Sequence, residues 1–327
     1  MNEEIRSVWM RMGQPGKGGV AMGLKLWWNK WLRPIHLTGL MVLAMALDGT
    51  ALAKTQPVRA FTVVVQEKTI ELLHQPKKEV TVWAFGLEGQ EATVPGPVIR
   101  VPMGTRVRVH FKNTHVLPHS MHFHGVHPFN MDGNGIRELG KEQLQMPGES
   151  YTYEWTPAAP GYYLYHCHFD TANHMDHGMY GFFIVEDPAW PKVDREILTI
   201  WDEWDIDGDG RYDTHTINSK STPDEEPLTA KVGETVRLVM ANVGAEVHAP
   251  HMHGVKWTVL DPDDLTPIDK DYNGVISLAS AQIKVVEFIP SNLGTWLFHC
   301  HVLPHVADDG LYHRGMLTRL NVLKGPS

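Results

Sequence analysis

The sequence predicts an all-β protein built from two sandwich domains. A chain of 327 residues has the length of about two ordinary domains. It contains 29 glycines and 22 prolines, which separate short segments of alternating apolar and polar residues. That combination is typical of antiparallel β-sandwiches. A repeat within the chain gives the third indication, because each predicted domain carries the same motifs.

The repeat begins with a His-x-x-His-x-His-Gly motif. It reads "HSMHFHG" from His119 to Gly125 and "HAPHMHG" from His248 to Gly254. The segments "GTRVRVHFKNT" and "GETVRLVMANV" precede the two copies, and both alternate with period 2 as a half-buried strand does. Some forty residues after each copy comes a strand that ends in His-Cys-His. The chain is therefore predicted to be two copies of one unit.

The predicted boundary between the units lies in "EDPAWPKVDRE", where Pro188 and Pro191 interrupt the strand pattern. We expect the first domain to span residues 54–188 and the second to span residues 189–327.

Residues 1–53 belong to neither copy and are predicted to be a secretory signal peptide. Lys25, Lys30 and Arg33 are basic residues of this segment. An apolar stretch from Leu37 to Leu47 follows, and then a small-residue cleavage pattern from Ala51 to Ala53. The apolar stretch is short for a membrane span. An export signal places the protein in the periplasm or outside the cell. Which methionine codon starts translation is left open, because a signal peptide that begins at Met22 would have a normal length.

The charge of the predicted mature chain argues against nucleic acid as a partner. Residues 1–53 carry six Lys or Arg and three Asp or Glu, so the rest has 23 basic and 35 acidic residues and a net charge of about −12 with neutral histidines. Such a surface repels phosphate backbones.

The two cysteines of the chain, Cys167 and Cys300, each stand between two histidines. Exported proteins usually form disulfides, but a bridge between these two would leave the flanking histidines without a role. A thiolate among imidazoles is a copper environment. On a strand the cysteine points to one face and its neighbours to the other, so each His-Cys-His is predicted to serve two metal sites.

A blue (type 1) copper site needs a thiolate, two imidazoles and a weak axial thioether. In the first domain the predicted ligands are His119, Cys167, His174 and Met179, with His177 as an alternative to His174. In the second domain they are His248, Cys300 and His305, with Met316 as a possible axial group. The segment between His305 and Met316 is longer than its counterpart, which leaves Met316 open.

The repeated motifs contain eight further histidines, four in each domain. They are His122, His124, His166 and His168 in the first domain, and His251, His253, His299 and His301 in the second. Eight imidazoles that face one another suit a cluster of three copper ions, whereas four would not.

With these motifs the chain resembles the multicopper oxidases, in particular the two-domain, laccase-like members built from cupredoxin domains. The resemblance covers nearly all of the predicted mature chain. It implies cupredoxin-like Greek-key sandwiches and about four to five copper ions per subunit, of type 1, type 2 and binuclear type 3. It also implies that electrons from phenolic, aromatic or metal-ion reductants reach a trinuclear cluster that reduces O₂ to water. The cluster would lie between subunits of a homotrimer.

The resemblance also proposes Asp132, in the Asp-Gly after the histidine strand, as the carboxylate that delivers protons to the cluster. The alternative is that Asp132 only shapes the turn before Gly133.

Other functions are considered beside the oxidase. Copper nitrite reductases share the architecture, but they have an aspartate where this chain has His122, and their second domain lacks a full set of cluster histidines. A copper carrier would leave eight histidines unused. A cuprous oxidase of copper tolerance would be indicated by a methionine-rich insert, and the methionines here are scattered.

The acidic segment "DIDGDGRYD" from Asp205 to Asp213 resembles a calcium loop. An EF-hand requires glutamate at the twelfth position, which is Thr216 here, so the match fails. An acidic hairpin turn is the favoured interpretation.

Overall fold

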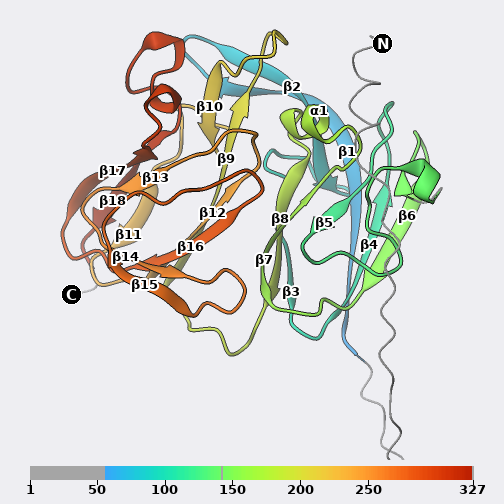
Figure 1. Cartoon of the computed structure of the whole chain (residues 1–327), viewed down its shortest axis with the longest axis horizontal. Helices are drawn as coiled ribbons and strands as arrows, with labels where there is room; N and C mark the ends of the chain where they lie inside the picture. Colours follow the sequence, from blue (N-terminus) through green and yellow to red (C-terminus); the bar gives the residue numbers. More distant parts are fainter. Residues whose placement is uncertain (1–55, 141–142, 326–327) are drawn as a thin grey trace, which may run out of the picture. The chain divides into compact units, whose positions relative to one another are not determined.

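The computed structural model describes residues 56–140 and 143–325, and residues 54–327 form one compact unit. The predicted signal peptide and start codon lie outside the described residues. As predicted from the sequence, the fold is nearly all β (Figure 1). Among the described residues, no helix has the length and apolar character needed to cross a bilayer.

The first half of the chain forms two four-stranded sheets. In spatial order, one sheet contains β2 (Lys78–Leu87), β1 (Val58–Leu73), β4 (Arg106–Lys112) and β6 (Ser150–Trp155). The other contains β3 (Ile99–Pro102), β8 (Tyr180–Glu186), β7 (Gly161–His166) and β5 (His122–His124). A short helix, α1 (Thr171–Asp176), lies between β7 and β8, and a 3₁₀ turn spans Arg137–Leu139.

The second half repeats this plan with a larger first sheet. Its order is β10 (Thr214–Ile217), β9 (Arg195–Trp204), β12 (Val236–Asn242), β16 (Ile283–Phe288), β14 (Trp257–Leu260) and β15 (Pro267–Tyr272). The other sheet has β11 (Leu228–Lys231), β18 (Leu317–Leu323), β17 (Gly294–Cys300) and β13 (Pro250–Met252). Two 3₁₀ turns, Leu303–Val306 and Asp308–Gly310, lie between β17 and β18.

The sandwiches are mixed rather than purely antiparallel. The pairs β1 with β4 and β9 with β12 are parallel, as are β3 with β8 and β11 with β18. A parallel pair cannot be joined by a tight hairpin, so the chain crosses between the two sheets, as in a Greek key. Local alternation identified the strands but could not show this direction.

The segment in which the domain boundary is predicted joins β8 to β9. β8 ends at Glu186 and β9 begins at Arg195, and the segment with Pro188 and Pro191 between them contains no strand. Trp190 in this segment stacks on Tyr162 of β7, with ring centroids 5.2 Å apart.

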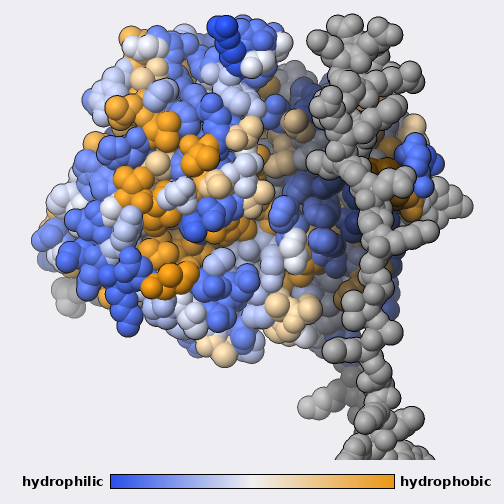
Figure 2. Space-filling model, viewed as in Figure 1, coloured by the Kyte–Doolittle hydropathy of each residue, from blue (hydrophilic) through white to orange (hydrophobic). Residues whose placement is uncertain are grey.

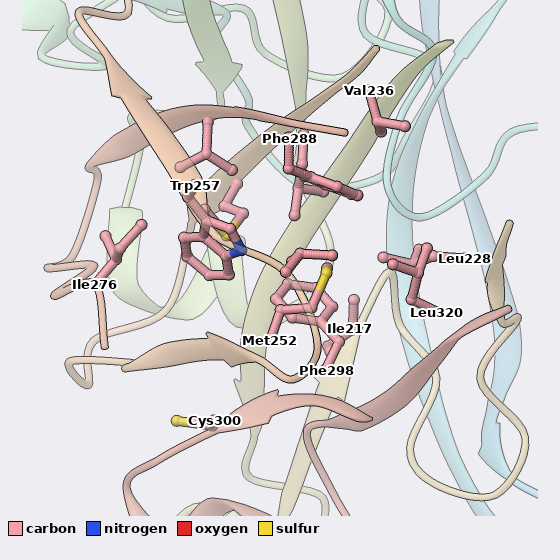
Figure 3. Close-up of a cluster of buried hydrophobic side chains, with 14 of the residues drawn as sticks. Ile217, Leu228, Val236, Met252, Trp257, Ile276, Phe288, Phe298, Cys300 and Leu320 are labelled. Atoms are coloured by element: carbon pink, nitrogen blue, oxygen red, sulfur yellow. The ribbon is translucent and has the colours of Figure 1, made fainter. Parts of the chain in front are cut away.

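Each sandwich has its own core, made by the inward residues of its strands. Phe123 of β5 is fully buried among the rings of Tyr153, Trp155 and Phe183. Figure 3 shows the core of the second sandwich, where Trp257, Phe288 and Phe298 pack together and Cys300 lies at the margin. Because β-strand side chains alternate, burying Phe123 places its neighbours His122 and His124 on the other face.

The hairpin of β1 and β2 also reaches the second half of the chain (Figure 1). Its tip accepts a backbone hydrogen bond at the carbonyl of Leu72 from Ser221, and Arg314 donates to the carbonyl of Gln75. Lys78 donates to Thr214 Oγ1 at 2.9 Å and lies 3.1 Å from an oxygen of Asp309. These contacts join residues that are far apart in sequence.

Candidate metal centres

Three buried donor atoms of the first domain converge at the place predicted for a type 1 site. Nδ1 of His119 lies 3.1 Å from Nδ1 of His174, and Sγ of Cys167 lies 3.2 Å from His174 Nδ1 and 3.9 Å from His119 Nδ1. A point in their plane that is equally distant from these three atoms lies about 2.0 Å from each. This distance is close to the bond length of an imidazole nitrogen to a transition metal. The donor set therefore fits a copper ion.

Burial keeps these groups in the form that suits a metal. It lowers the pKa of His119 to about 3 and of His174 to about 4, so both imidazoles are neutral with a lone pair available. Burial also raises the pKa of the Cys167 thiol to about 11. A bound cation would oppose that shift by favouring the thiolate.

Local backbone hydrogen bonds hold the site. The backbone N–H of Ser120 donates to Cys167 Sγ at 3.5 Å. Met179 is fully buried, and its backbone is hydrogen-bonded to both Cys167 and His174. Of the two alternatives, His174 is the one brought to the cysteine, whereas His177 stacks on Trp83 with ring centroids 3.9 Å apart.

The second domain repeats the arrangement. Nδ1 of His305 lies 3.2 Å from Nδ1 of His248 and 3.5 Å from Sγ of Cys300, which accepts the backbone N–H of Ala249. Met316 is fully buried and is hydrogen-bonded to Cys300 and His305 through its backbone, as Met179 is in the first site. The longer segment before Met316 is taken up by 3₁₀ turns, so it does not displace this residue.

The surroundings of the two sites differ, and sequence reasoning did not assign them. In the first domain, His115 lies behind His119 (ring nitrogens 2.8 Å apart) and Trp83 packs against both His119 and His174. In the second domain, carboxylates take this place. Glu203 Oε2 lies 3.1 Å from His248 Nε2, and Glu246 Oε2 lies 2.9 Å from His305 Nε2.

His215 completes the second-site surroundings. Its ring stacks on His305 with centroids 4.4 Å apart, and its Nδ1 lies 2.7 Å from an oxygen of Asp308. Burial opposes its charge, but the hydrogen bonds and charges of Asp308 and Glu246 outweigh this and raise the pKa of His215. No sequence motif includes His215. An alignment of the two repeats would have drawn attention to Glu203.

The four remaining histidines of the first domain lie together on the other face of the His-Cys-His strand. Ring nitrogens of His122, His124 and His166 all come within 4.8 Å of one another, and the ring of His168 lies 4.8 Å from that of His122. Burial lowers the pKa of His122 to about 4 and that of His166 to about 3. His166 Nδ1 is 2.9 Å from the Cys167 carbonyl, which turns its Nε2 toward the group.

The second domain presents a matching set. His299 Nε2 lies 3.3 Å from His253 Nε2, and the ring of His251 lies 5.1 to 5.8 Å from those of the other three, His253, His299 and His301. Each set includes histidines of a strand at a sheet edge: His122 and His124 lie on β5, and His251 lies on β13. Among the described residues, no ring contact joins the two sets within one chain.

Asp132 lies beside the first set, but its carboxylate is engaged in the turn. Its Oδ1 accepts the backbone N–H of Asn134 at 2.9 Å, and its backbone carbonyl oxygen lies 2.6 Å from His122 Nδ1. The exposed His127 is a further imidazole nearby, with its ring 4.7 Å from that of His122.

The acidic segment after β9 brings oxygens of Asp205, Asp207 and Asp213 within 4.8 Å of one another. The carboxylate of Asp205 accepts backbone N–H groups of Gly208, Asp209 and Gly210. Backbone donors of the same segment therefore close this turn.

Known proteins are similar to this chain in sequence and in fold. Family models described as multicopper oxidase match residues 64–189 and 202–318. A solved multicopper oxidase named mgLAC is 30% identical with a TM-score of 0.72, over 83% of this chain and 88% of its own.

Two curated relatives are longer. A probable nitrite reductase-hydroxylamine oxidoreductase fusion protein of Kuenenia stuttgartiensis is 30% identical over 267 residues, which is 75% of this chain and 30% of that protein. Mouse hephaestin is 29% identical over 274 residues, which is 70% of this chain and 22% of hephaestin. The chain thus spans less than a third of these relatives. With its paired sandwiches, its repeated motifs and these matches, the chain belongs to the multicopper oxidase family.

Proposed function

We propose that the protein is a laccase-like oxidase that takes single electrons from a reductant at type 1 copper and reduces O₂ to water at a trinuclear copper cluster. One observation carries this proposal. In each domain a single His-Cys-His segment has its cysteine in a buried N,N,S donor set and its histidines in a four-histidine set.

Bound copper would supply the one-electron redox chemistry and the reduction of oxygen. The protein holds the donor atoms and connects the two kinds of site. Cys167 is covalently joined to His166 and His168, and the Nδ1 of His166 lies 2.9 Å from the Cys167 carbonyl. This gives a short path of bonds between an entry site and the cluster, and the second domain repeats it at Cys300.

The trinuclear cluster is proposed to form between subunits of a homotrimer. β5 and its neighbouring His-Cys-His segment provide only four of the eight histidines, and β13 with its neighbouring His-Cys-His segment provides the other four. The two groups of histidines belong to different sandwiches. An unpaired sheet edge is a natural place for another chain to bind. Figure 2 shows hydrophobic residues grouped among hydrophilic ones over the second sandwich, as expected of a face that contacts a second subunit.

The two entry sites favour different reductants. Beside the first site, the half-buried Trp83 and the ring of His177 stacked on it offer a platform for a phenol or aromatic amine. Beside the second, the half-exposed Glu246 and the imidazole of His215 offer ligands for a reducing metal ion such as ferrous or cuprous ion. A metal-ion reductant is therefore a second candidate, favoured by the position of Glu246 against His305.

Nitrite reduction is the alternative reaction, since one relative is named a probable nitrite reductase fusion. The complete set of four histidines in the second domain, and His122 in the first, favour oxygen. Asp132 stays the candidate for proton delivery because it adjoins His122. We further propose export to the periplasm or beyond, through the predicted signal peptide.

Oxygen uptake by the copper-loaded trimer tests the function. With a phenolic reductant we expect about four electrons consumed per O₂ and no peroxide, since full reduction to water requires four. The Cys167→Ser/Cys300→Ser double variant keeps the eight cluster histidines and is the matched control, which should retain cluster copper but lose uptake. Nitrite consumption without oxygen uptake by the fully loaded trimer would refute the oxidase function.

The choice of reductant needs its own comparison. Glu246→Gln should slow oxidation of ferrous ion more than oxidation of a phenol, and Trp83→Ala should do the reverse. Equal effects on both reductants would contradict separate entry sites.

A further inference from the structure

We propose that Glu203 is a positioning residue that lowers the reduction potential of the second type 1 site below that of the first. The inference rests on the proposed function, since it requires copper at both sites. It adds that the two sites accept electrons from reductants of different strength.

The internal repeat shows where the two sites differ. In the first domain Lys112 of β4 pairs with Val64 of β1. In the second domain its counterpart in the repeat, Ala241 of β12, pairs with Ile200 of β9. Glu67 lies three residues after Val64 and Glu203 lies three residues after Ile200, so the two glutamates occupy equivalent positions. Their surroundings are not equivalent, because in the first domain a histidine separates the glutamate from the ligand.

That histidine is His115, and Gly244 takes its place in the second domain. The backbone N–H of His115 donates to Asn113 Oδ1 at 3.0 Å, and the backbone N–H of Gly244 donates to Asn242 Oδ1 at 2.9 Å. A Cβ on Gly244 would overlap with the carboxylate of Glu203. The absence of a side chain at position 244 is thus what lets Glu203 reach the ligand.

The carboxylate of Glu203 is fixed and shielded from water. Its Oε1 accepts the backbone N–H groups of Ala245 at 2.5 Å and Glu246 at 2.7 Å. Its Oε2 lies 3.1 Å from His248 Nε2, both side chains are fully buried, and neither atom has a hydrogen-bond partner among the described residues. By contrast, the Glu67 side chain is 56% exposed and lies 3.2 Å from His115 rather than from a ligand.

The electrostatic consequence follows from the charge of the metal. A carboxylate stabilises a dipositive ion more than a monopositive one, and it does so more strongly where water does not screen it. This effect favours Cu(II) at the second site and lowers its potential.

The decisive experiment isolates each site within the copper-loaded trimer. Cys167→Ser leaves only the second type 1 site, and Cys300→Ser leaves only the first. Redox titration of the remaining blue absorption then gives each potential separately. We expect the second site to have the lower potential.

In the Cys167→Ser background, Glu203→Gln should shift the Cu(II)/Cu(I) equilibrium toward Cu(I) by at least about tenfold, which is about 59 mV for one electron. Glu203→Asp retains the charge and should shift it less. The matched control is Glu67→Gln in the Cys300→Ser background, which should leave the potential of the first site nearly unchanged. If Glu203→Gln prevents assembly, Gly244→Ala displaces the carboxylate and should raise the potential.

The outcomes separate the two proposals. An unchanged potential in Glu203→Gln or Gly244→Ala, or equal shifts in Glu203→Asp and Glu203→Gln, would overturn the role of Glu203 and leave the oxidase function intact. Trimeric Cys167→Ser protein without any blue absorption would instead refute type 1 copper in the second domain.

Discussion

Replacing Phe123 by alanine should destabilise the first sandwich and disorder the histidine strand at its edge. Phe123 is fully buried, and its ring centroid lies 4.6 Å from that of Trp155 and 5.4 Å from that of Phe183. Removing a buried phenylalanine side chain costs about 3–5 kcal/mol, from lost burial and from the cavity that remains. Because His122 and His124 flank this anchor on a strand of three residues, the loss should also weaken copper binding by the cluster.

Urea unfolding of the metal-free protein gives the free energy of unfolding, and metal analysis with electron paramagnetic resonance gives cluster copper in the loaded protein. Phe123→Leu is the control, and it should lose less stability because it leaves a smaller cavity. A loss below about 1 kcal/mol for Phe123→Ala, with cluster copper unchanged, would refute the idea that this buried ring positions the histidines.

Three further changes have definite expected outcomes. Tyr180→Phe removes the hydroxyl that donates to Asp202 at 2.6 Å; both groups are buried, so we expect a loss of about 1–3 kcal/mol in urea unfolding. Gly133→Ala adds a Cβ where the backbone has φ +71° and where it would overlap a neighbouring carbonyl, so it should reduce stability and cluster copper measured by metal analysis. The pKa of His215 is raised in the folded protein, so its stabilisation with Asp308 is complete below the unfolded pKa of about 6.5 and is lost as the pH rises through the folded pKa. The difference in unfolding free energy between the unmodified protein and Asp308→Asn should therefore shrink from pH 6 toward alkaline pH.

Control variants for the first two changes, and the pH dependence of the third, separate the stated cause from a general effect. Tyr162→Phe removes a hydroxyl that also bonds a carboxylate, Glu196, but at a partly buried site, and should cost less than Tyr180→Phe. Gly104→Ala has a similar φ of +78° with open space around the added Cβ, so it should leave cluster copper unchanged. A difference for Asp308→Asn that does not vary with pH would show that His215 is not charged in the folded protein.

Much of the site was predictable because its ligands are close in sequence and on regular strands. The alternation of His166, Cys167 and His168 follows from strand geometry alone, and the structure places them on opposite faces as expected. The choice between His174 and His177 depends on the helical turn of α1, which the spacing did not reveal.

The surroundings of the sites were not predictable in this way. Glu203 reaches His248 only because Gly244, 41 positions later, has no side chain. The stacking of His215 on His305 joins residues 90 positions apart. Such contacts depend on how separate strands meet, and a single strand pattern contains no information about that.

The docking of the β1–β2 hairpin bears on how the chain reaches its final structure. The tip of this hairpin is bonded to residues as late as Asp309 and Arg314, with sequence separations of 231 and 239 residues. Contacts of such high contact order form slowly, since a long loop must close before they contribute. The hairpin tip can therefore complete its contacts only after the segment with Asp309 and Arg314 has been synthesised. A chain that stops before residue 300 would have a hairpin tip that lacks its contacts with Asp309 and Arg314, and an incompletely covered strand pair is a place where one nascent chain can associate wrongly with another.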